Sequence, residues 1–285
     1  IQGLLAISFI VDKHLISSFP PLLYIGSRIL CAGIMLLVYT TYTHGLQFIM
    51  TNVKNAWYEF SKLTLIHSYI SFGTTLIALE LVSSAEASLL YNLTPCFTAM
   101  FAYTLYKQPF NLYKKIGLIV CTLSLLYLFS GRLLTDDMST SSTIGIPLLI
   151  FSVAMNAYAW LFFNDIQQRY NFSETFLCSI DLTAGGILLL LTSLMVEQWH
   201  INGTWTTIIP LFITMLLTID IGYINLYGYL LSYYSATLMS LSRIIAPFIT
   251  AAISSFLLNE AIPDTFTGAC MLMGIGLYIF YSHDE

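Results

Sequence analysis

Charged residues are scarce in this chain. Asp, Glu, Lys and Arg make up 9% of its 285 residues, whereas they make up roughly 25% of an average soluble domain. Hydrophobic residues make up 57%, which is more than a soluble domain of this size can hide, because much of its surface stays in contact with water. The composition therefore excludes a soluble enzyme and a disordered chain, and it indicates a membrane protein with several spans.

Sequence features of several other protein classes are also missing. No run of basic residues is present and the formal net charge is −5, so no nucleic-acid partner is expected. The chain has no Walker A motif, so it is not expected to pump a solute with ATP on its own. The five cysteines stand in apolar runs without the spacing of metal ligands, and no cofactor is expected.

Long apolar runs follow one another along nearly the whole chain. A helix needs about 20 apolar residues to cross the roughly 30 Å hydrocarbon core of a bilayer. Runs of this length without strict alternation favour helices over the strands of a barrel. The sequence therefore predicts an all-α, polytopic membrane protein with ten transmembrane helices. The predicted spans are 1–18, 21–41, 62–82, 85–106, 113–131, 142–163, 174–196, 206–228, 235–258 and 264–282.

Basic residues fall mainly in one set of the predicted loops. One set contains Lys54, Lys62, Lys107, Lys114, Lys115 and Arg169, and the other contains only Arg132. Loops rich in Lys and Arg stay in the cytoplasm, so both termini are predicted to be cytoplasmic. The near absence of long loops favours a bacterial inner (plasma) membrane.

The two halves of the sequence resemble each other. The segment around Pro95 matches the segment around Pro247, 152 residues further on, and the segment around Gly117 matches that around Gly268 with a shift of 151 residues. Five spans per copy is an odd number, so the second copy is predicted to be inverted. Inverted repeats are the architecture of many secondary transporters, with the substrate site near the midplane. The predicted repeats are 1–131 and 142–282.

Four short motifs occur in order along the chain. They are Ile7–Val11 followed by Lys13 and Arg28; Ala78 and Leu79 with Ser84, Ala85 and Pro95; Ala157–Trp160; and Leu258–Ala261 followed by Gly268. Together they resemble the EamA-like branch of the drug/metabolite transporter superfamily. The resemblance implies ten helices, transport of a small organic metabolite and no bound cofactor. The chain departs from the family at Gln108, where a second Glu like Glu260 is usual, which argues for a structural role of Glu260.

Two charged residues lie deep in predicted spans of the second half. A charge at the bilayer centre costs about a few kcal/mol, so it normally faces a cavity or a partner. Asp220 is predicted either to contact a substrate amine or carry a proton, or to form a structural ion pair. Arg243 is predicted either to hold an anionic substrate group through two parallel bonds, or to neutralise Asp220.

Asp12 and Arg28 are charged residues inside the first two predicted spans. Asp12 is predicted to line a cavity, and Arg28 is predicted either to pair with Asp12 or to contact the solute. Lys13 is expected to reach the outer interface with its long side chain, because adjacent helix residues point about 100° apart and Asp12 and Lys13 do not face the same partner.

Three further polar residues are interpreted mainly as structural or interfacial. Asp181 lies about a turn and a half inside its span, and it is interpreted either as an interfacial residue that reaches cytoplasmic water or as a functional residue inside the bundle. His67 is predicted to make a structural hydrogen bond. Glu86 is predicted to stabilise the N-terminus of its helix through the helix dipole.

Aromatic and amide side chains near the predicted helix breaks are candidates to line the same cavity. Tyr223 and Tyr227 are four residues apart, so they share a helix face near Asp220. An aromatic wall beside a carboxylate and an arginine suits a zwitterionic or partly aromatic metabolite. The predicted substrate-binding residues are Asp12, Arg28, Tyr91, Asn92, Trp160, Asp220, Tyr223, Tyr227 and Arg243.

The sequence as a whole predicts a secondary transporter and not an enzyme. It is expected to move a small organic metabolite, such as an amino acid or a related amphipathic solute, across the bilayer by alternating access. Proton coupling through Asp220, exchange and passive facilitation are equally consistent with the sequence. A monomer or a homodimer is expected. The transported solute, the direction of transport and the roles of Glu80, Glu86 and Asp181 stay open.

Other functions are less favoured by the sequence. A nucleotide-sugar or sugar-phosphate exchanger of the same fold is the alternative, although it needs several basic residues to hold phosphates and only Arg243 is deeply placed. A membrane-embedded enzyme is disfavoured because no metal pair, nucleophile elbow or matched pair of aspartates is present. A receptor or a structural membrane component is a further alternative, which would bind a solute tightly without transporting it.

Overall fold

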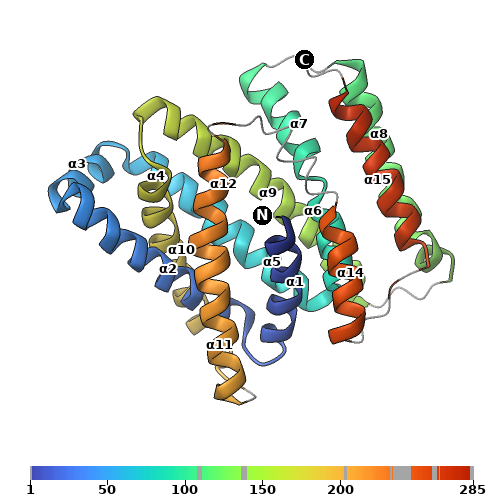
Figure 1. Ribbon diagram of the computed structural model, residues 1–285, viewed down its shortest axis with the longest axis horizontal. Helices are drawn as coiled ribbons and strands as arrows, with labels where there is room; N and C mark the ends of the chain where they lie inside the picture. The colour runs from blue at the N-terminus through green and yellow to red at the C-terminus, as the bar shows by residue number, and fades with distance from the viewer. Residues whose placement is uncertain are drawn as a thin grey trace.

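Helices form all the regular structure that is described in this chain. The computed structural model describes residues 2–107, 111–135, 140–201, 204–231, 233, 245–258, 262 and 264–282, and every regular element in these ranges is helical (Figure 1). The prediction of an all-α chain is therefore confirmed. Within these ranges, four helices are long and apolar enough to span a bilayer by length and composition: Pro21–His44, Thr143–Tyr170, Glu174–Val196 and Trp205–Leu230.

The helices of the first half run from Gln2 to Thr135. Their bounds are α1 Gln2–Ile16, α2 Pro21–His44, α3 Leu46–Asn55, α4 Trp57–Thr64, η1 Leu65–Ser71, α5 Phe72–Leu81, α6 Ser84–Tyr91, α7 Thr94–Tyr106 and α8 Leu112–Thr135. The elements named η are π-helices, which take one more residue per hydrogen-bonded turn than an α-helix.

The helices of the second half run from Thr140 to Tyr281. Their bounds are α9 Thr140–Tyr170, α10 Glu174–Val196, α11 Trp205–Met215, η2 Leu216–Tyr223, α12 Ile224–Leu231, α14 Ala246–Leu257 and α15 Phe266–Tyr281. The first residues of the predicted span 235–258 lie outside the described part of the chain, up to residue 244. Helix α14 occupies the rest of that span.

The segment 42–61, which lies between two predicted spans, is largely helical. It contains the end of α2, all of α3 and the start of α4. Helix α3 has one buried residue, Ile49, and its other residues face outward or lie at intermediate depth. Leu46, Ile49, Met50 and Val53 have the spacing of one helix face, but ten residues are too few to cross a bilayer, so a search for membrane spans does not find this helix.

Contacts from distant residues satisfy the ends of several helices. The Glu197 carboxylate, just after α10, accepts hydrogen bonds from the backbone N–H groups of Leu22 (2.8 Å) and Leu23 (3.0 Å) in the first turn of α2. Ser83 and Glu86 form a capping box at the start of α6, which confirms the predicted role of Glu86. These partners remove polar backbone groups that would otherwise be unpaired in lipid.

Lys13 completes the end of α5. Its Nζ donates hydrogen bonds to the carbonyl oxygens of Leu79 (2.6 Å) and Val82 (2.8 Å). Lys13 thus reaches the turn after α5 and binds backbone carbonyls there. A positive charge at a helix C-terminus is favourable because the last carbonyl groups carry the negative end of the helix dipole.

Helices α2 and α10 cross at very short range, and this crossing is one of the most extensive helix contacts in the structure. A Cβ atom added to Gly33 would lie 2.4 Å from the backbone nitrogen of Thr183, and one added to Gly186 would lie 2.7 Å from the backbone nitrogen of Leu30. Glycine on both helices lets the two backbones approach, as is common between membrane helices.

Replacing Gly33 by Ala is expected to lower the free energy of unfolding by about 1–3 kcal/mol, because the added methyl group overpacks the crossing of α2 and α10. Thermal unfolding of the purified protein in detergent measures this loss. Gly3→Ala is the matched control, since nothing lies within 4 Å of a Cβ atom at Gly3. Equal melting temperatures for the two variants would contradict the close approach of the helices.

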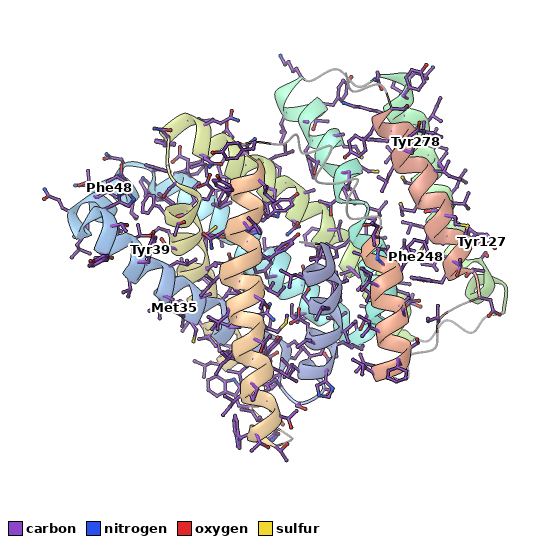
Figure 2. All side chains as sticks on the ribbon, viewed as in Figure 1. Met35, Tyr39, Phe48, Tyr127, Phe248 and Tyr278 are labelled. Atoms are coloured by element: carbon purple, nitrogen blue, oxygen red, sulfur yellow. The ribbon has the colours of Figure 1, made fainter. Side chains whose placement is uncertain are left out.

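Large apolar side chains cover much of the outer surface. Tyr39, on α2, is 58% exposed and Tyr278, on α15, is 70% exposed, and both lie at the outside of the bundle (Figure 2). Met35, Phe48, Tyr127 and Phe248 are also exposed. Such a surface is unfavourable in water and is suited to contact with lipid.

The two π-helices recur at equivalent places in the halves. Segments η1 and η2 begin 151 residues apart and end 152 residues apart, which is the same offset as that between the sequence repeats. Pro95 and Pro247 are likewise each the second residue of a helix, α7 and α14. Helix α2 packs on α10, and α8 packs on α15, so corresponding helices of the two halves contact each other.

Candidate functional site

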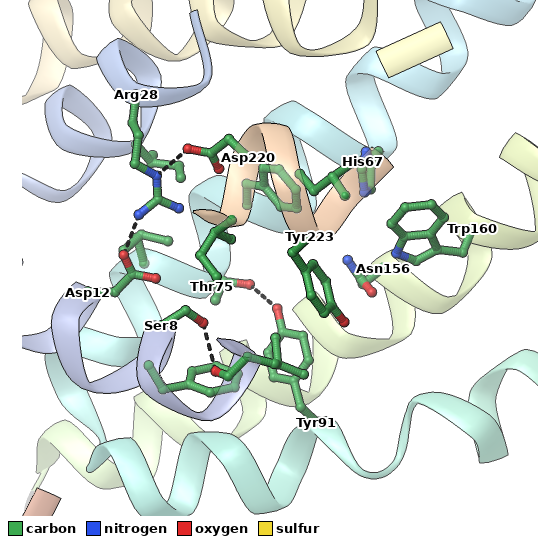
Figure 3. A pocket seen from close by; sticks show the side chains of 17 residues that line it. Ser8, Asp12, Arg28, His67, Thr75, Tyr91, Asn156, Trp160, Asp220 and Tyr223 are labelled. Atoms are coloured by element: carbon green, nitrogen blue, oxygen red, sulfur yellow. Dashed lines mark hydrogen bonds and ion pairs between the residues drawn. The ribbon is translucent and has the colours of Figure 1, made fainter. Parts of the chain in front are cut away.

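A small cavity lies where helices of both halves meet. Its volume is about 100 Å³, below the roughly 300–1,000 Å³ of sites that hold drug-sized ligands. Helices α1, α2, η1, α5 and α6 line it from the first half, and α9, η2 and α12 line it from the second (Figure 3). The lining residues are Leu5, Ser8, Phe9, Asp12, Ile25, Arg28, His67, Phe72, Thr75, Leu76, Tyr91, Asn156, Trp160, Ile219, Asp220, Tyr223 and Ile224.

Arg28 joins two carboxylates at one end of this cavity. Its Nη1 pairs with Oδ1 of Asp12, and its Nε lies 2.7 Å from Oδ2 of Asp220. The side chains of Arg28 and Asp220 are 4% and 1% exposed. The guanidinium thus links α1, α2 and η2, which come from both halves of the chain (Figure 3).

Tyr24 holds the first of these pairs in place. Its hydroxyl donates a hydrogen bond to Oδ1 of Asp12 at 2.6 Å and accepts one from Nη1 of Arg28. Tyr24 and Arg28 are four residues apart on α2, so both side chains lie on the same helix face. The Tyr24 ring also lies 5.0 Å from the guanidinium carbon of Arg28.

The three charges do not cancel. Two carboxylates and one guanidinium carry one net negative charge when all are ionised, and all three groups are buried. An uncompensated charge in a low-dielectric site is unfavourable. The cluster formed by Asp12, Arg28 and Asp220, here called the charged cluster, therefore favours either a bound cation or a proton.

A hydrogen-bonded polar wall connects the charged cluster to the rest of the cavity. The hydroxyl of Thr75 lies 2.7 Å from the hydroxyl of Tyr91 and donates to the carbonyl of Ser71 at 2.8 Å. The hydroxyl of Ser152 also donates to that carbonyl at 2.8 Å. These contacts tie η1, α5, α6 and α9 together around the cavity.

His67 and Asp181 form a second buried polar pair. Nδ1 of His67 lies 2.6 Å from Oδ2 of Asp181, and the side chains are 2% and 1% exposed. The interfacial interpretation of Asp181, in which it reaches cytoplasmic water, is therefore wrong, because α10 turns this carboxylate toward η1. The structural hydrogen bond predicted for His67 is confirmed, and His67 also lines the cavity.

Most of the predicted binding residues are gathered at the cavity. Those that line it are Asp12, Arg28, Tyr91, Trp160, Asp220 and Tyr223. Asn92 is buried at the C-cap of α6 and is not among the lining residues. Tyr227 packs against the Trp160 ring, with 4.9 Å between ring centroids, and also lies behind the lining. Arg243 lies outside the described residues.

Asp220 has a partner that the sequence did not indicate. The structure pairs Asp220 with Arg28, whereas Arg243, one of whose two predicted roles was to neutralise Asp220, lies outside the described residues. The predicted pairing of Arg28 with Asp12 is confirmed. Arg28 pairs with both carboxylates because η2 places the Asp220 side chain next to α2.

Sequence reasoning missed several lining residues. Asn156, Thr75 and Ser8 are buried polar residues at the cavity, and none was a candidate. Asn156 gave a usable signal, because an amide in the middle of an apolar span needs a polar partner or a cavity. Thr75 and Ser8 gave none, since hydroxyl groups in membrane helices commonly bond to their own backbone.

Comparisons with known proteins agree with this architecture. Residues 4–130 match the family described as the EamA-like transporter family. The S-adenosylmethionine/S-adenosylhomocysteine transporter of Chlamydia muridarum is 27% identical over 98% of this chain and 88% of its own length. The transporter of the same name from Chlamydia trachomatis serovar L2 is 26% identical over 98% and 85%.

A solved structure shares the fold. A crystal structure described only as that of a protein covers 98% of this chain and 95% of its own, with a TM-score of 0.64 and 14% sequence identity. At this identity the likeness shows the fold alone.

The family match and the relatives define a multi-pass membrane transporter and not an enzyme. More narrowly, the first half of the chain is similar to the EamA-like transporter family, and nearly the whole chain is similar to its curated relatives.

Proposed function

We propose that this protein is a secondary carrier for S-adenosylmethionine and S-adenosylhomocysteine, or for closely related adenosyl amino acids. The charged cluster is the observation that carries this proposal. It has one net negative charge in a buried cavity, and S-adenosylmethionine has one net positive charge, because its sulfonium adds to a zwitterionic amino acid. Binding of this cation would neutralise the site.

The amino-acid part of the solute also matches the cluster. Arg28 is suited to a carboxylate, because guanidinium binds carboxylates through two parallel hydrogen bonds. Asp12 and Asp220 are suited to an ammonium group and a sulfonium. A phosphate-bearing solute is a poorer match, since the described lining contains two carboxylates against one arginine. The nucleotide-sugar alternative is therefore disfavoured.

The residues around the cluster extend the proposed site. Tyr91, Trp160 and Tyr223 would contact the solute from the cavity wall. Asn92 and Tyr227 lie behind that wall and would contact the solute only if the helices move. Arg243 is also proposed to contact the solute.

The architecture supports transport by alternating access. We propose ten membrane spans in two inverted repeats, 1–131 and 142–282, because the π-helices recur with the offset of the sequence repeats and corresponding helices contact each other. The two halves would rock around the cavity. Since the cavity holds about 100 Å³, the halves must separate to admit a solute of nucleoside size.

Exchange of the two solutes needs a balancing charge. S-adenosylhomocysteine is a neutral thioether. When it is bound, the charged cluster therefore keeps its net negative charge unless a proton also binds. We propose that Asp220 takes this proton. Its Oδ2 lies 2.7 Å from Nε of Arg28, whereas Asp12 and Tyr24 contact Nη1 of the same guanidinium. The carrier itself is proposed to lie in a bacterial inner membrane with cytoplasmic termini, as a monomer or homodimer.

Proteoliposomes test the proposed function. Vesicles loaded with S-adenosylhomocysteine are expected to take up labelled S-adenosylmethionine, and empty vesicles are expected to take up much less. Unlabelled S-adenosylmethionine should compete, whereas a nucleotide sugar should not. Uptake that is no greater than in protein-free vesicles, or competition by the nucleotide sugar alone, would exclude this assignment.

A further inference from the structure

The cavity has two chemically different ends. The charged cluster lies at one end, and His67, Asn156 and Trp160 lie at the other, with Tyr223 between them (Figure 3). These three residues come from η1 and α9, which are not part of the charged cluster. An elongated solute with one charged and one uncharged end would therefore have a preferred orientation.

The His67 ring is fixed and leaves one nitrogen facing no protein partner. Its Nδ1 is held by Asp181 at 2.6 Å, and its ring lies 4.7 Å from that of Phe72 and 5.2 Å from that of Trp160. Within the described residues, Nε2 of His67 is buried and has no hydrogen-bond partner. A carboxylate on Nδ1 fixes the tautomer in which a neutral ring offers Nε2 as an acceptor.

Asn156 and Trp160 complete this end. They are one helical turn apart on α9, so they share a face, and both line the cavity. An Asn amide offers one acceptor and one donor, the pattern that pairs with the exocyclic amine and the neighbouring ring nitrogen of adenine. An indole ring is a surface on which a planar base can stack.

We propose that His67, Asn156 and Trp160 form a subsite for a 6-aminopurine, with Asp181 as the residue that positions His67. This inference rests on the proposed function and adds an orientation to it. The exocyclic amine has two hydrogens, one for Nε2 of His67 and one for the Asn156 carbonyl oxygen. The sulfonium and amino-acid groups then lie at the charged cluster.

A base analogue tests the subsite independently of the charged cluster. S-inosylhomocysteine differs from S-adenosylhomocysteine by an oxygen in place of the exocyclic amine, so it offers an acceptor where the site needs a donor. In wild-type proteoliposomes, S-adenosylhomocysteine is expected to inhibit S-adenosylmethionine uptake at least about tenfold more strongly than the inosyl analogue. The ratio of the two inhibition constants does not depend on how much protein is folded.

Variants assign the preference to named residues. His67→Phe combined with Asn156→Leu is expected to reduce the ratio to about twofold or less, while His200→Phe, at an exposed histidine, leaves it unchanged. Asp181→Leu should reduce the ratio, and Asp181→Asn should retain more of it, because the amide oxygen can still accept from Nδ1. A purely structural Asp181 would change stability without changing the ratio.

The possible results separate the two proposals. Uptake of S-adenosylmethionine without a wild-type preference for the amino base, or with a preference that survives in the double variant, overturns the subsite and leaves the proposed function intact. Absence of any S-adenosylmethionine uptake by wild-type protein overturns both.

Discussion

Asp220→Asn is expected to lower uptake of S-adenosylmethionine by about 10- to 100-fold, and to lower uptake of S-adenosylhomocysteine by no more than about threefold. The substitution leaves Arg28 paired with Asp12, so the cluster becomes neutral. A neutral site no longer compensates a cationic sulfonium, whereas it accepts a neutral thioether. Initial rates for the two labelled solutes in proteoliposomes measure the change in selectivity.

An exposed aspartate provides the control for this change. Asp165 forms an ion pair with Arg169 at 2.6 Å, and the two side chains are 25% and 56% exposed. Asp165→Asn is expected to leave both uptake rates close to wild type. Equal losses for the two solutes in Asp220→Asn would show that Asp220 acts only in the scaffold, and would contradict its role in compensating the sulfonium charge.

Arg28→Met is expected to lower the free energy of unfolding by about 3–5 kcal/mol, because it leaves two buried carboxylates without their common partner. It is also expected to abolish transport of both solutes. The loss of stability is measured by heating the purified protein in detergent and recording the fraction that stays monodisperse at each temperature.

Charge compensation distinguishes this effect from lost packing. The triple variant Asp12→Asn, Arg28→Met, Asp220→Asn has no buried ions in the cluster, and it is expected to regain more than half of the lost stability while remaining inactive. Arg169→Met, at the exposed pair, is expected to cost less than about 1 kcal/mol. A triple variant no more stable than Arg28→Met alone would refute the electrostatic explanation.

The helices were largely predictable because membrane spans are long and apolar. The predicted runs match the described helices to within a few residues in most places, since a bilayer sets both the length and the composition of each span. The exception is α3, where Leu46, Ile49, Met50 and Val53 have the spacing of one helix face, but the helix is too short to be recognised as a membrane span. The two π-helices were not predictable either, because an extra residue in a turn leaves no mark on hydrophobicity.

The site was predictable only in part. The pairing of Arg28 with Asp12 followed from two charges in consecutive spans that are joined by a short turn. The pairing of Arg28 with Asp220 joins residues from different halves of the chain, and no spacing along the sequence indicates it. Asp181 was misplaced for a similar reason, since its partner His67 lies 114 residues earlier in the chain.

The geometry suggests why the charges lie where the halves meet. The charged cluster joins η2 of the second half to α1 and α2 of the first, so the Arg28–Asp220 ion pair crosses the boundary along which the halves would separate. A solute that competes for these carboxylates would weaken the contacts between the halves. Binding and opening would thereby be coupled, provided that the solute interacts differently with the two states.

A density map of the protein with bound S-adenosylmethionine tests the central claim most directly. The account predicts ligand density in the cavity between the two halves, with the sulfonium and amino-acid groups beside Asp12 and Asp220. Ligand density elsewhere would contradict it. So would a bound ligand beside which Arg28 still pairs with both Asp12 and Asp220 as it does here.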